Sequence, residues 1–444
     1  MRILLATDSF PPRCGGSGWS TYELARGLRA SSHDVLVVQP VPLGPSSDSA
    51  LAGYRTTADT LASMPVTSFA YDGIPVRRVG FRAPNVPVLR NYFKNERLTA
   101  TLSRAIAATV ERDAIDVVHA QHVWTTPPSV VAARRTGRPV VCTVRDYWPV
   151  CYWSTLIVDD RRAALCPACS THGMRRCLAS RSGIWAPLAT GLIPYMQANL
   201  ARKAAAVAAC DRVIAVSTTI ARDLVERCPG LAADRLRTIP NPVDVAGLTS
   251  ESTRGGAPLE GPYTLYVGKL AANKGVAKLF EAIERARMQT PLVVVGDGPS
   301  RSEVEARARA SGRHVRFTGW VARDEALRWM AHAQWMIFPS QGPESLSRVL
   351  LESGALGVPA AAMDTGGTRD IVVPGVTGLL SNDVDGLARD ISTLEADPAL
   401  RERLGRAAAA HVASRFGAAQ VVARVLEIYG EALEGRPALE EGRG

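Results

Sequence analysis

The sequence predicts an α/β protein with two doubly wound parallel sheets, and three observations support this. Short apolar runs alternate with helical patterns along most of the chain, which is typical of parallel strands joined by crossover helices. The alternation is interrupted at residues 246–262, where Ser, Gly, Pro and Thr give the composition of a linker. The chain has 444 residues, of which 46% are hydrophobic, so each of two domains can bury a core.

The chain opens with a predicted βαβ unit. Ile3–Ala6 reads as a buried strand, a helix is expected over residues 20–30, and residues 33–38 form the next strand. The loop between strand and helix contains Gly15 and Gly16, which let a backbone approach a ligand closely. An ordinary turn explains the same two glycines equally well.

Polar side chains follow two later strands of the first half. His119 and His122 close one predicted strand, and Arg145 and Asp146 follow the next. The carboxyl ends of parallel strands form the edge where open α/β sheets bind ligands. A buried histidine that only satisfies core hydrogen bonds also explains His119, and strand-end packing also explains the segment after Val144.

Two segments of the first half do not fit the alternation. Residues 44–68 are rich in Ser, Ala, Thr and Gly and predict a mobile surface excursion. Farther on, Cys151, Cys166, Cys169 and Cys177 include one Cys-x-x-Cys pair. Four thiolates can hold a structural zinc ion, and free or redox-active thiols are the alternative.

The charge balance limits the classes of partner. The net charge of +10 permits contact with anionic membranes, but the arginines are scattered and no motif for nucleic-acid binding is present, so we expect no nucleic-acid partner. Residues 182–201 carry no charge, yet prolines and polar residues interrupt them, which predicts a soluble or interfacial helix. The N-terminus does not resemble a signal peptide. We therefore expect a cytoplasmic protein, with peripheral contact at the inner membrane face as an option.

The second half concentrates lysines in one window. The chain has only five lysines, and Lys269, Lys274 and Lys278 all follow the strand predicted at residues 263–267. A compact ammonium on a flexible stem suits a diphosphate whose charge grows as a bond breaks. Two later turns, one with Gly296 and Gly298 and one with Trp320 and Val321, could be ordinary turns.

The centre of the second half is a strand, a tight loop and a helix. The strand covers residues 334–338, and the helix is expected to begin near Ser345, so the backbone N–H groups of Ser345, Leu346 and Ser347 would bind a phosphate. A helical rise would separate Glu344 from Glu352 by about 12 Å. That exceeds the ~5 Å between two carboxylates that act in a double displacement. The alternative is that one glutamate caps the helix and the other only lies on it.

A family resemblance rests on this segment. The segment consists of Glu344, seven residues, Glu352 and then Ser-Gly-Ala-Leu-Gly-Val-Pro, and several glycines follow at residues 366–378. This pattern resembles the donor-site signature of the retaining nucleotide-sugar glycosyltransferases of family 4. The resemblance spans most of residues 1–430. It implies the GT-B fold, in which two Rossmann-like domains with doubly wound parallel sheets face each other across a cleft.

The resemblance also implies the division of the chain. The expected parts are an N-terminal Rossmann-like acceptor domain (1–245) with a cysteine-containing insertion (150–180), a linker (246–262), a C-terminal Rossmann-like nucleotide-sugar domain (263–417), a helix that crosses back to the N-terminal domain (418–433) and a frayed tail (434–444).

The residue roles that the resemblance implies fall into two groups. Catalysis is expected to involve Glu344 at the sugar, Lys274 and Lys269 at the leaving diphosphate, and His119. The donor is expected to contact Gly15, Gly16, Gly296, Gly298, Trp320, Val321, Ser345, Leu346, Ser347 and Glu352. On the acceptor side the candidates are Arg145, Asp146 and His122; Arg145 stands where the family has a histidine, which bears on the identity of the acceptor.

The implied reaction transfers a hexose from a nucleoside diphosphate sugar, UDP- or GDP-linked, to an acceptor hydroxyl with retention at the anomeric carbon. No cofactor or metal is expected in catalysis. A lipid-linked acceptor of cell-envelope glycan or glycolipid synthesis and a small-molecule acceptor both remain open. A nucleotide-sugar epimerase of the same fold and a non-catalytic glycosyltransferase-like partner are the alternatives.

Overall fold

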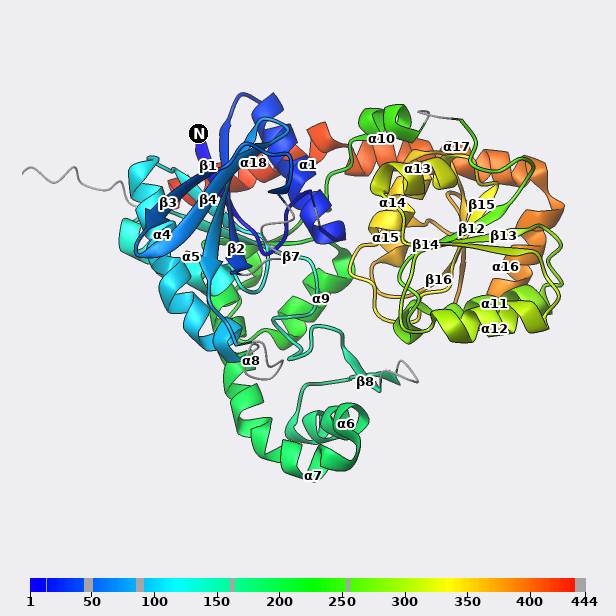
Figure 1. The fold of residues 1–444 in the computed structure, drawn as a ribbon, viewed down its shortest axis with the longest axis horizontal. Helices are drawn as coiled ribbons and strands as arrows, with labels where there is room; N and C mark the ends of the chain where they lie inside the picture. The colour runs from blue at the N-terminus through cyan, green and yellow to red at the C-terminus, as the bar shows by residue number, and fades with distance from the viewer. Residues whose placement is uncertain (13, 44–50, 85–91, 160–163, 253–255, 436–444) are drawn as a thin grey trace, which may run out of the picture. The chain divides into compact units, whose positions relative to one another are not determined.

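The chain forms two compact units, each with its own sheet and core (Figure 1). The computed structural model describes residues 1–12, 14–43, 51–84, 92–159, 164–252 and 256–435. The first unit comprises Met1–Ser154, Pro194–Pro242 and Val421–Gly444, and the second comprises Thr155–Ile193 and Val243–Gln420.

The first unit contains a nine-stranded sheet that is parallel except at one edge. Its strands in spatial order are β11 (Leu236–Thr238), β10 (Arg212–Ala215), β7 (Val140–Val144), β6 (Val117–Ala120), β1 (Arg2–Ala6), β2 (Asp34–Pro42), β5 (Ile74–Phe81), β4 (Met64–Tyr71) and β3 (Thr57–Leu61).

The antiparallel edge corrects one prediction. The described part of the expected excursion at residues 44–68 forms β3 and the start of β4, while residues 44–50 lie outside the described residues. Four of the five residues of β3 are exposed, because an edge strand faces solvent on one side and needs few apolar residues. Its composition therefore resembles that of a loop.

Helices cover both faces of the first sheet. One core cluster packs Leu24 and Leu28 together with Val421, Val425 and Tyr429 from the end of the chain, and a second cluster forms on residues of α4. The helices of the first unit are α1 (Gly16–Ala30), η2 (Phe93–Arg97), α4 (Leu98–Arg112), α5 (Thr126–Thr136), α8 (Ile193–Ala208), α9 (Thr218–Arg227), η5 (Ala233–Arg235) and α18 (Ala418–Glu434). The predicted tail, 434–444, falls almost wholly outside the described residues.

The second unit contains a six-stranded, fully parallel sheet whose four inner strands are short and buried, as expected where helices cover both faces. Its strands in spatial order are β14 (Val315–Gly319), β13 (Leu292–Val295), β12 (Thr264–Val267), β15 (Trp335–Phe338), β16 (Ala360–Met363) and β17 (Leu379–Ser381). The surrounding helices are α10 (Val245–Ser252), η6 (Ala272–Lys274), α11 (Val276–Arg285), α12 (Arg301–Ala310), α13 (Arg323–Ala331), α14 (Arg348–Ala355), α15 (Thr368–Ile371), α16 (Val384–Ala396) and α17 (Pro398–Phe416). Because α10 covers residues 246–252, the first part of the predicted linker is helical.

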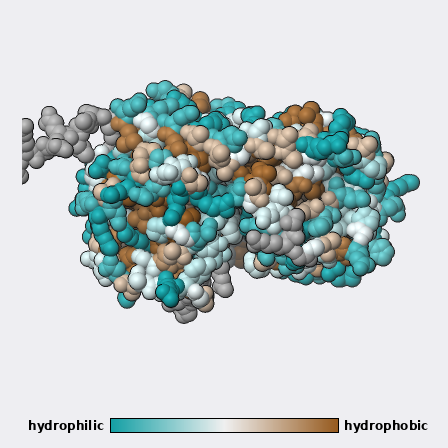
Figure 2. Space-filling model, turned by 90° about the horizontal axis from the view of Figure 1, so that it is seen from above, coloured by the Kyte–Doolittle hydropathy of each residue, from teal (hydrophilic) through white to brown (hydrophobic). Residues whose placement is uncertain are grey.

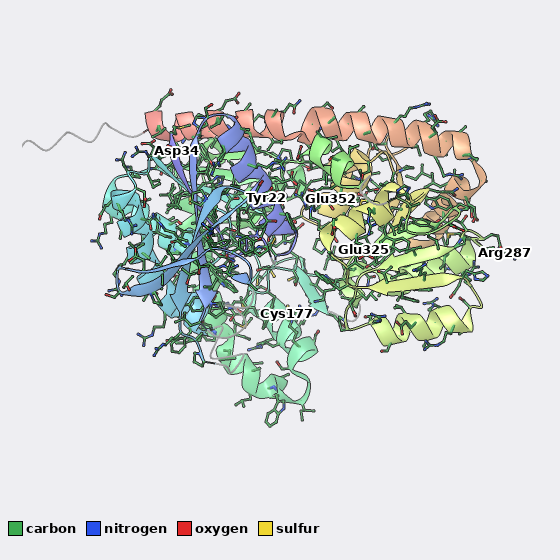
Figure 3. The ribbon with its side chains drawn as sticks, turned by 45° about the horizontal axis from the view of Figure 1, so that its top comes forward. Tyr22, Asp34, Cys177, Arg287, Glu325 and Glu352 are labelled. Atoms are coloured by element: carbon green, nitrogen blue, oxygen red, sulfur yellow. The ribbon has the colours of Figure 1, made fainter. Side chains whose placement is uncertain are left out.

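Thr155–Ile193, which contains most of the predicted insertion at 150–180 and extends beyond it, groups with the second unit, although we expected the insertion within the N-terminal domain. This segment, the insertion as the structure has it, consists of β8 (Ile157–Asp159), β9 (Ala164–Leu165), α6 (Thr171–Ser182), η3 (Gly183–Trp185), α7 (Ala186–Ala189) and η4 (Thr190–Leu192). Val158, Cys166 and Cys177 form a small core of their own, and Figure 3 labels Cys177 on α6.

The parallel part of each sheet reverses its strand order once. In the first sheet β1 lies between β2 and β6, and in the second sheet β12 lies between β13 and β15. The loops that leave two such neighbouring strands run in opposite directions, which opens a crevice at the carboxyl ends of the strands. These two switch points are where ligands are expected.

The described surface is mostly hydrophilic on the face shown in Figure 2, with hydrophobic residues in small groups. No helix among the described residues is both long enough and apolar enough to cross a membrane.

Candidate active site

The switch point of the second sheet brings Lys274 and Glu344 together. Lys274 lies in the loop after β12 and Glu344 in the loop after β15, and Lys274 Nζ lies 2.7 Å from Glu344 Oε1. The Ser340 hydroxyl donates to the same carboxylate oxygen. The side chain of Glu344 is 11% exposed and that of Lys274 is 34% exposed, so the pair is held in place but accessible from one side.

Backbone-to-backbone packing fixes these loops. A Cβ on Gly275 would lie 1.8 Å from the carbonyl oxygen of Pro339, and one on Gly366 would lie 2.0 Å from that of Glu344. Both glycines have positive φ angles, 70° and 55°. The N–H of Gly367 donates to the Glu344 carbonyl at 2.7 Å. Only glycine permits such contacts, and they lock the main chain of Glu344.

The helix after Glu344 begins later than predicted. It starts at Arg348, and Ser347 is its N-cap, with its hydroxyl accepting from the N–H of Leu350. Ser345 and Leu346 precede the helix, so first-turn N–H groups begin at Arg348 and not at Ser345. The helical rise also does not apply between Glu344 and Ser347, so the 12 Å separation loses its basis.

Glu352 lies on α14, as Figure 3 shows, and is bound by two arginines. Its Oε1 accepts from Arg348 Nε at 2.8 Å and from Arg323 Nη1. The two guanidinium groups offset the cost of burying a carboxylate that is only 9% exposed.

The switch point of the first sheet holds a second charged cluster. Asp8 follows β1, His122 follows β6 and Asp146 follows β7. His122 Nδ1 lies 2.8 Å from Asp8 Oδ2, and His122 Nε2 lies 3.1 Å from Asp146 Oδ2. Burial alone would lower the pKa of His122, but the two carboxylates outweigh it and raise the pKa to about 10. The imidazolium is therefore a hydrogen-bond donor and not a general base.

Asp8 was missed by the sequence analysis. Its position two residues beyond a predicted strand was the available signal, but only the order of the strands places it beside His122. Its Oδ1 is buried without a hydrogen-bond partner among the described residues, as are both amide atoms of the neighbouring Gln121. Buried polar atoms left in this state indicate a place where water or a ligand completes the site.

Comparison with known proteins assigns the family. The model of Glycosyltransferase Family 4 matches residues 14–246, and the model described as glycosyl transferases group 1 matches residues 249–411. The chain belongs to glycosyltransferase family 4.

Two relatives show how family 4 members resemble this chain. The D-inositol 3-phosphate glycosyltransferase of Xylanimonas cellulosilytica is 34% identical over 273 residues, which are 57% of this chain and 64% of the relative. The chain thus spans just under two thirds of that relative. The glycogen synthase of Mycobacterium tuberculosis is 27% identical over 453 residues and covers 97% of this chain and 94% of its own length.

Solved structures of GT-B proteins share the fold over the whole chain. HepE from Anabaena in complex with UDP has a TM-score of 0.65 and 20% identity, and covers 97% of this chain and 100% of its own. Sucrose-phosphate synthase from Thermosynechococcus elongatus has a TM-score of 0.70 and 18% identity, and the match covers 98% of this chain and 100% of that structure. The predicted GT-B fold class is therefore confirmed.

The remaining donor-side candidates lie in loops at the carboxyl edge of the second sheet. Gly296 and Gly298 pack against the main chain, since Cβ atoms there would lie 2.1 Å from the Gly268 oxygen and 2.3 Å from the Leu270 oxygen. Trp320, after β14, is 81% exposed, and its neighbour Val321 is partly exposed. Lys269 is exposed after β12. Their contacts to a nucleotide stay predictions.

The structure places His119 in the core of the first unit, so its catalytic role stays a prediction. The side chain is fully buried, Nδ1 lies 2.6 Å from the Tyr429 hydroxyl and Nε2 lies 2.7 Å from that of Thr143. Burial lowers the pKa of His119 well below its usual value. A neutral ring with both nitrogens engaged is a core residue.

Arg145 is mostly buried and uses two of its donors within the first unit. Its Nε donates to Asn241 Oδ1 at 2.8 Å, and its Nη1 donates to the Gln121 carbonyl at 3.1 Å. Gly15 is the N-cap of α1, and Gly16 is its first residue. No heavy atom lies near a Cβ built on Gly15, so the loop is open there.

The first unit also has a cavity of about 180 Å³ that contains the chain's other two lysines. Lys94 Nζ lies 4.0 Å from the centroid of the Trp124 ring, and Lys203 Nζ lies 5.2 Å from that of Tyr152. The backbone N–H of Trp124 donates to Asp8 Oδ2, so the cavity adjoins the charged cluster. It is lined by Lys94, Asn95, Glu96, Thr99, Val123, Trp124, Pro127, Asn199, Arg202 and Lys203.

The described residues do not fit the predicted zinc site. No group of three or more His, Cys, Asp or Glu side chains in the described chain is arranged to hold a metal ion. Cys151, Cys166, Cys169 and Cys177 form no disulfide bond with one another among the described residues. Cys166 and Cys177 pack against Val158 as small apolar residues instead.

Proposed function

We propose that this family 4 protein is a retaining glycosyltransferase that moves a hexose from a nucleoside diphosphate sugar to an acceptor hydroxyl. The observation that carries the proposal is the Lys274–Glu344 pair, with Ser340, at the switch point of the second sheet. A carboxylate suits sugar hydroxyls, and an ammonium beside it suits the oxygens of a diphosphate. In this proposal the ammonium of Lys274 stabilises the negative charge that develops on the leaving diphosphate.

In this proposal the second unit binds the donor. Lys274 and Lys269 stabilise the leaving diphosphate, and Glu344 accepts hydrogen bonds from the sugar. Both arginines bind Oε1 of Glu352, so the ribose hydroxyls donate to Oε2. The chain is proposed to need no metal, because these lysines supply positive charge at the phosphates.

The proposed step takes place on one face of the sugar. The bond between the anomeric carbon and the β-phosphate oxygen breaks, and the acceptor oxygen forms its bond to the same face. The acceptor proton passes to the departing phosphate oxygen. This route uses no second carboxylate, and retention follows from attack on the face that the diphosphate leaves.

The acceptor is proposed to bind the first unit near Asp8, His122 and Asp146. These groups can orient a hydroxyl, and the neighbouring lysines suit an acceptor with a negative charge, such as a lipid-linked or phosphorylated molecule of cell-envelope synthesis. The relative from Xylanimonas is named for a phosphorylated compound, D-inositol 3-phosphate.

The experiment is donor hydrolysis without acceptor, over UDP-, GDP-, ADP- and dTDP-sugars. A UDP-hexose is the first choice, since the HepE complexes contain UDP and UDP-glucose. We expect slow release of one nucleotide, unchanged by EDTA, and a loss of about 100-fold or more in Glu344→Gln. The control is Glu402→Gln, an exposed glutamate on α17, which should keep the wild-type rate.

Three other results would redirect the proposal. Conversion of one nucleotide sugar into another without an acceptor would identify an epimerase. An unchanged rate in Glu344→Gln would remove the role of the pair. No binding of any donor, measured by calorimetry, would favour a non-catalytic partner.

A further inference from the structure

A short stretch of the insertion exposes four large apolar side chains. Ile184 is 89% exposed, Trp185 67%, Leu188 77% and Leu192 49%. They lie in the consecutive short turns η3, α7 and η4, which we call the tip. Among the described residues Ile184 is the most exposed large hydrophobic side chain.

The exposure is specific to the tip and does not reflect a poorly packed insertion. The preceding helix α6 buries Met174, Cys177 and Leu178. Arg181 fastens that helix to β8, since its Nη2 donates to the Ile157 carbonyl at 2.9 Å. The insertion thus has an ordered base that holds the tip, and a folded base gains nothing from leaving a tryptophan and three aliphatic residues in water.

The helix that precedes the tip carries two exposed positive charges. Arg175 and Arg176 are exposed on α6, which packs beside α7 (Figure 1). The sequence has no Asp or Glu between Asp160 and Asp211, so no acidic residue lies within the tip or on α6. Apolar side chains flanked by arginines without acids match a bilayer surface with anionic headgroups, where tryptophan prefers the interface.

We propose that the tip inserts into the headgroup region of an anionic membrane and that Arg175 and Arg176 bind lipid phosphates. A protein partner or a second copy of the chain is disfavoured because neither supplies a continuous acidic surface by itself. The inference goes beyond the proposed chemistry. Membrane binding needs no nucleotide sugar and can be measured without one.

The experiment is flotation of the full chain with vesicles of phosphatidylcholine alone or mixed equally with phosphatidylglycerol. We expect the wild type to float with the anionic vesicles and to be released by salt. The triple variant Ile184→Ser, Trp185→Ser, Leu188→Ser should bind the anionic vesicles at least about tenfold more weakly than the wild type. Arg175→Gln with Arg176→Gln should lose the preference for anionic vesicles.

The matched control is Val131→Ser with Val225→Ser, two valines elsewhere that are 49% and 57% exposed, and it should float like the wild type. Because all these positions are exposed, the variants should keep the wild-type thermal midpoint and the wild-type rate of donor hydrolysis. Failure of membrane binding is therefore distinguishable from failure of the proposed reaction.

Three results would overturn the inference. The first is a wild type that binds neither vesicle. The second is a triple serine variant that binds as well as the wild type. The third is a wild-type dimer, seen by light scattering, that the triple serine variant converts to monomers, because a second copy would then cover the tip.

Discussion

His119 and His122 lie three residues apart and have opposite ionisation. His119 lies in β6 inside the core, where burial keeps its ring neutral. His122 is 25% exposed and lies between Asp8 and Asp146, whose negative charges keep it protonated. The sequence could not separate them, because the carboxylates that decide the matter come from other strands.

The charge of His122 gives the first prediction. Its pKa rises from 6.5 in the free side chain to about 10 in the fold, so its stabilisation is complete below about pH 6.5 and is lost as the pH rises to about 10. We expect His122→Gln to be less stable than the wild type by on the order of 2 kcal/mol at pH 6.5. By pH 10 that gap should close.

Denaturant midpoints of both proteins at a series of pH values check this. The exposed His172 offers a control, and His172→Gln should follow the wild type throughout. A gap that stays constant, or widens with rising pH, would contradict the charged cluster.

At the scale of elements, the loops at the second switch point decide the site. Gly275 closes the loop that carries Lys274, with a positive φ and the Pro339 carbonyl where its Cβ would be. We expect Gly275→Ala to cost about 3 kcal/mol or more, because it adds a clash to the strain of φ. It should also abolish donor hydrolysis, since the clash pushes the β15 loop away.

A second glycine, Gly312, distinguishes the effect of the steric clash from the effect of the backbone strain. It has φ of 64°, close to the 70° of Gly275, but open space around its Cβ. Gly312→Ala should therefore cost only about 1 kcal/mol and keep the activity. Equal losses of stability in both variants, measured by thermal unfolding, would show that backbone strain alone matters.

Local pattern predicted some elements well and others poorly. The strands at residues 117–120 and 140–144 appear at those positions, because buried parallel strands have a distinct apolar signature. The predicted start of α14 was wrong. Serine is a good N-cap residue, so Ser345 and Ser347 are both suitable, and tertiary contacts decide which of the two caps the helix. Arg348 could have been predicted as an ion-pair partner of Glu352, because it lies four residues earlier on the same helix. Arg323 could not, because it comes from another helix.

At the scale of the whole molecule, helix α18 completes the first unit from the far end of the sequence. Val421, Val425 and Tyr429 belong to the core cluster that also contains Ile3 and Leu5 of β1. We expect Val425→Asp to destabilise the first unit by about 3 kcal/mol or more, because it buries an unpaired charge. Ala423→Asp, on the exposed side of the same helix, should have little effect.

Hydrogen exchange resolved by segment checks this prediction. Faster exchange should appear in β1 and β2, while the strands of the second unit keep their protection. Equal loss in both units would mean that the two cores unfold together.

The place of α18 also sets an order of events during synthesis. The ribosome releases β1 well before Tyr429, yet the Tyr429 hydroxyl lies 2.6 Å from His119 in the middle of the first sheet. The second unit has all of its residues once Gln420 has emerged. The unit that is made first therefore completes its core last, and until then one apolar face of its sheet is available to chaperones.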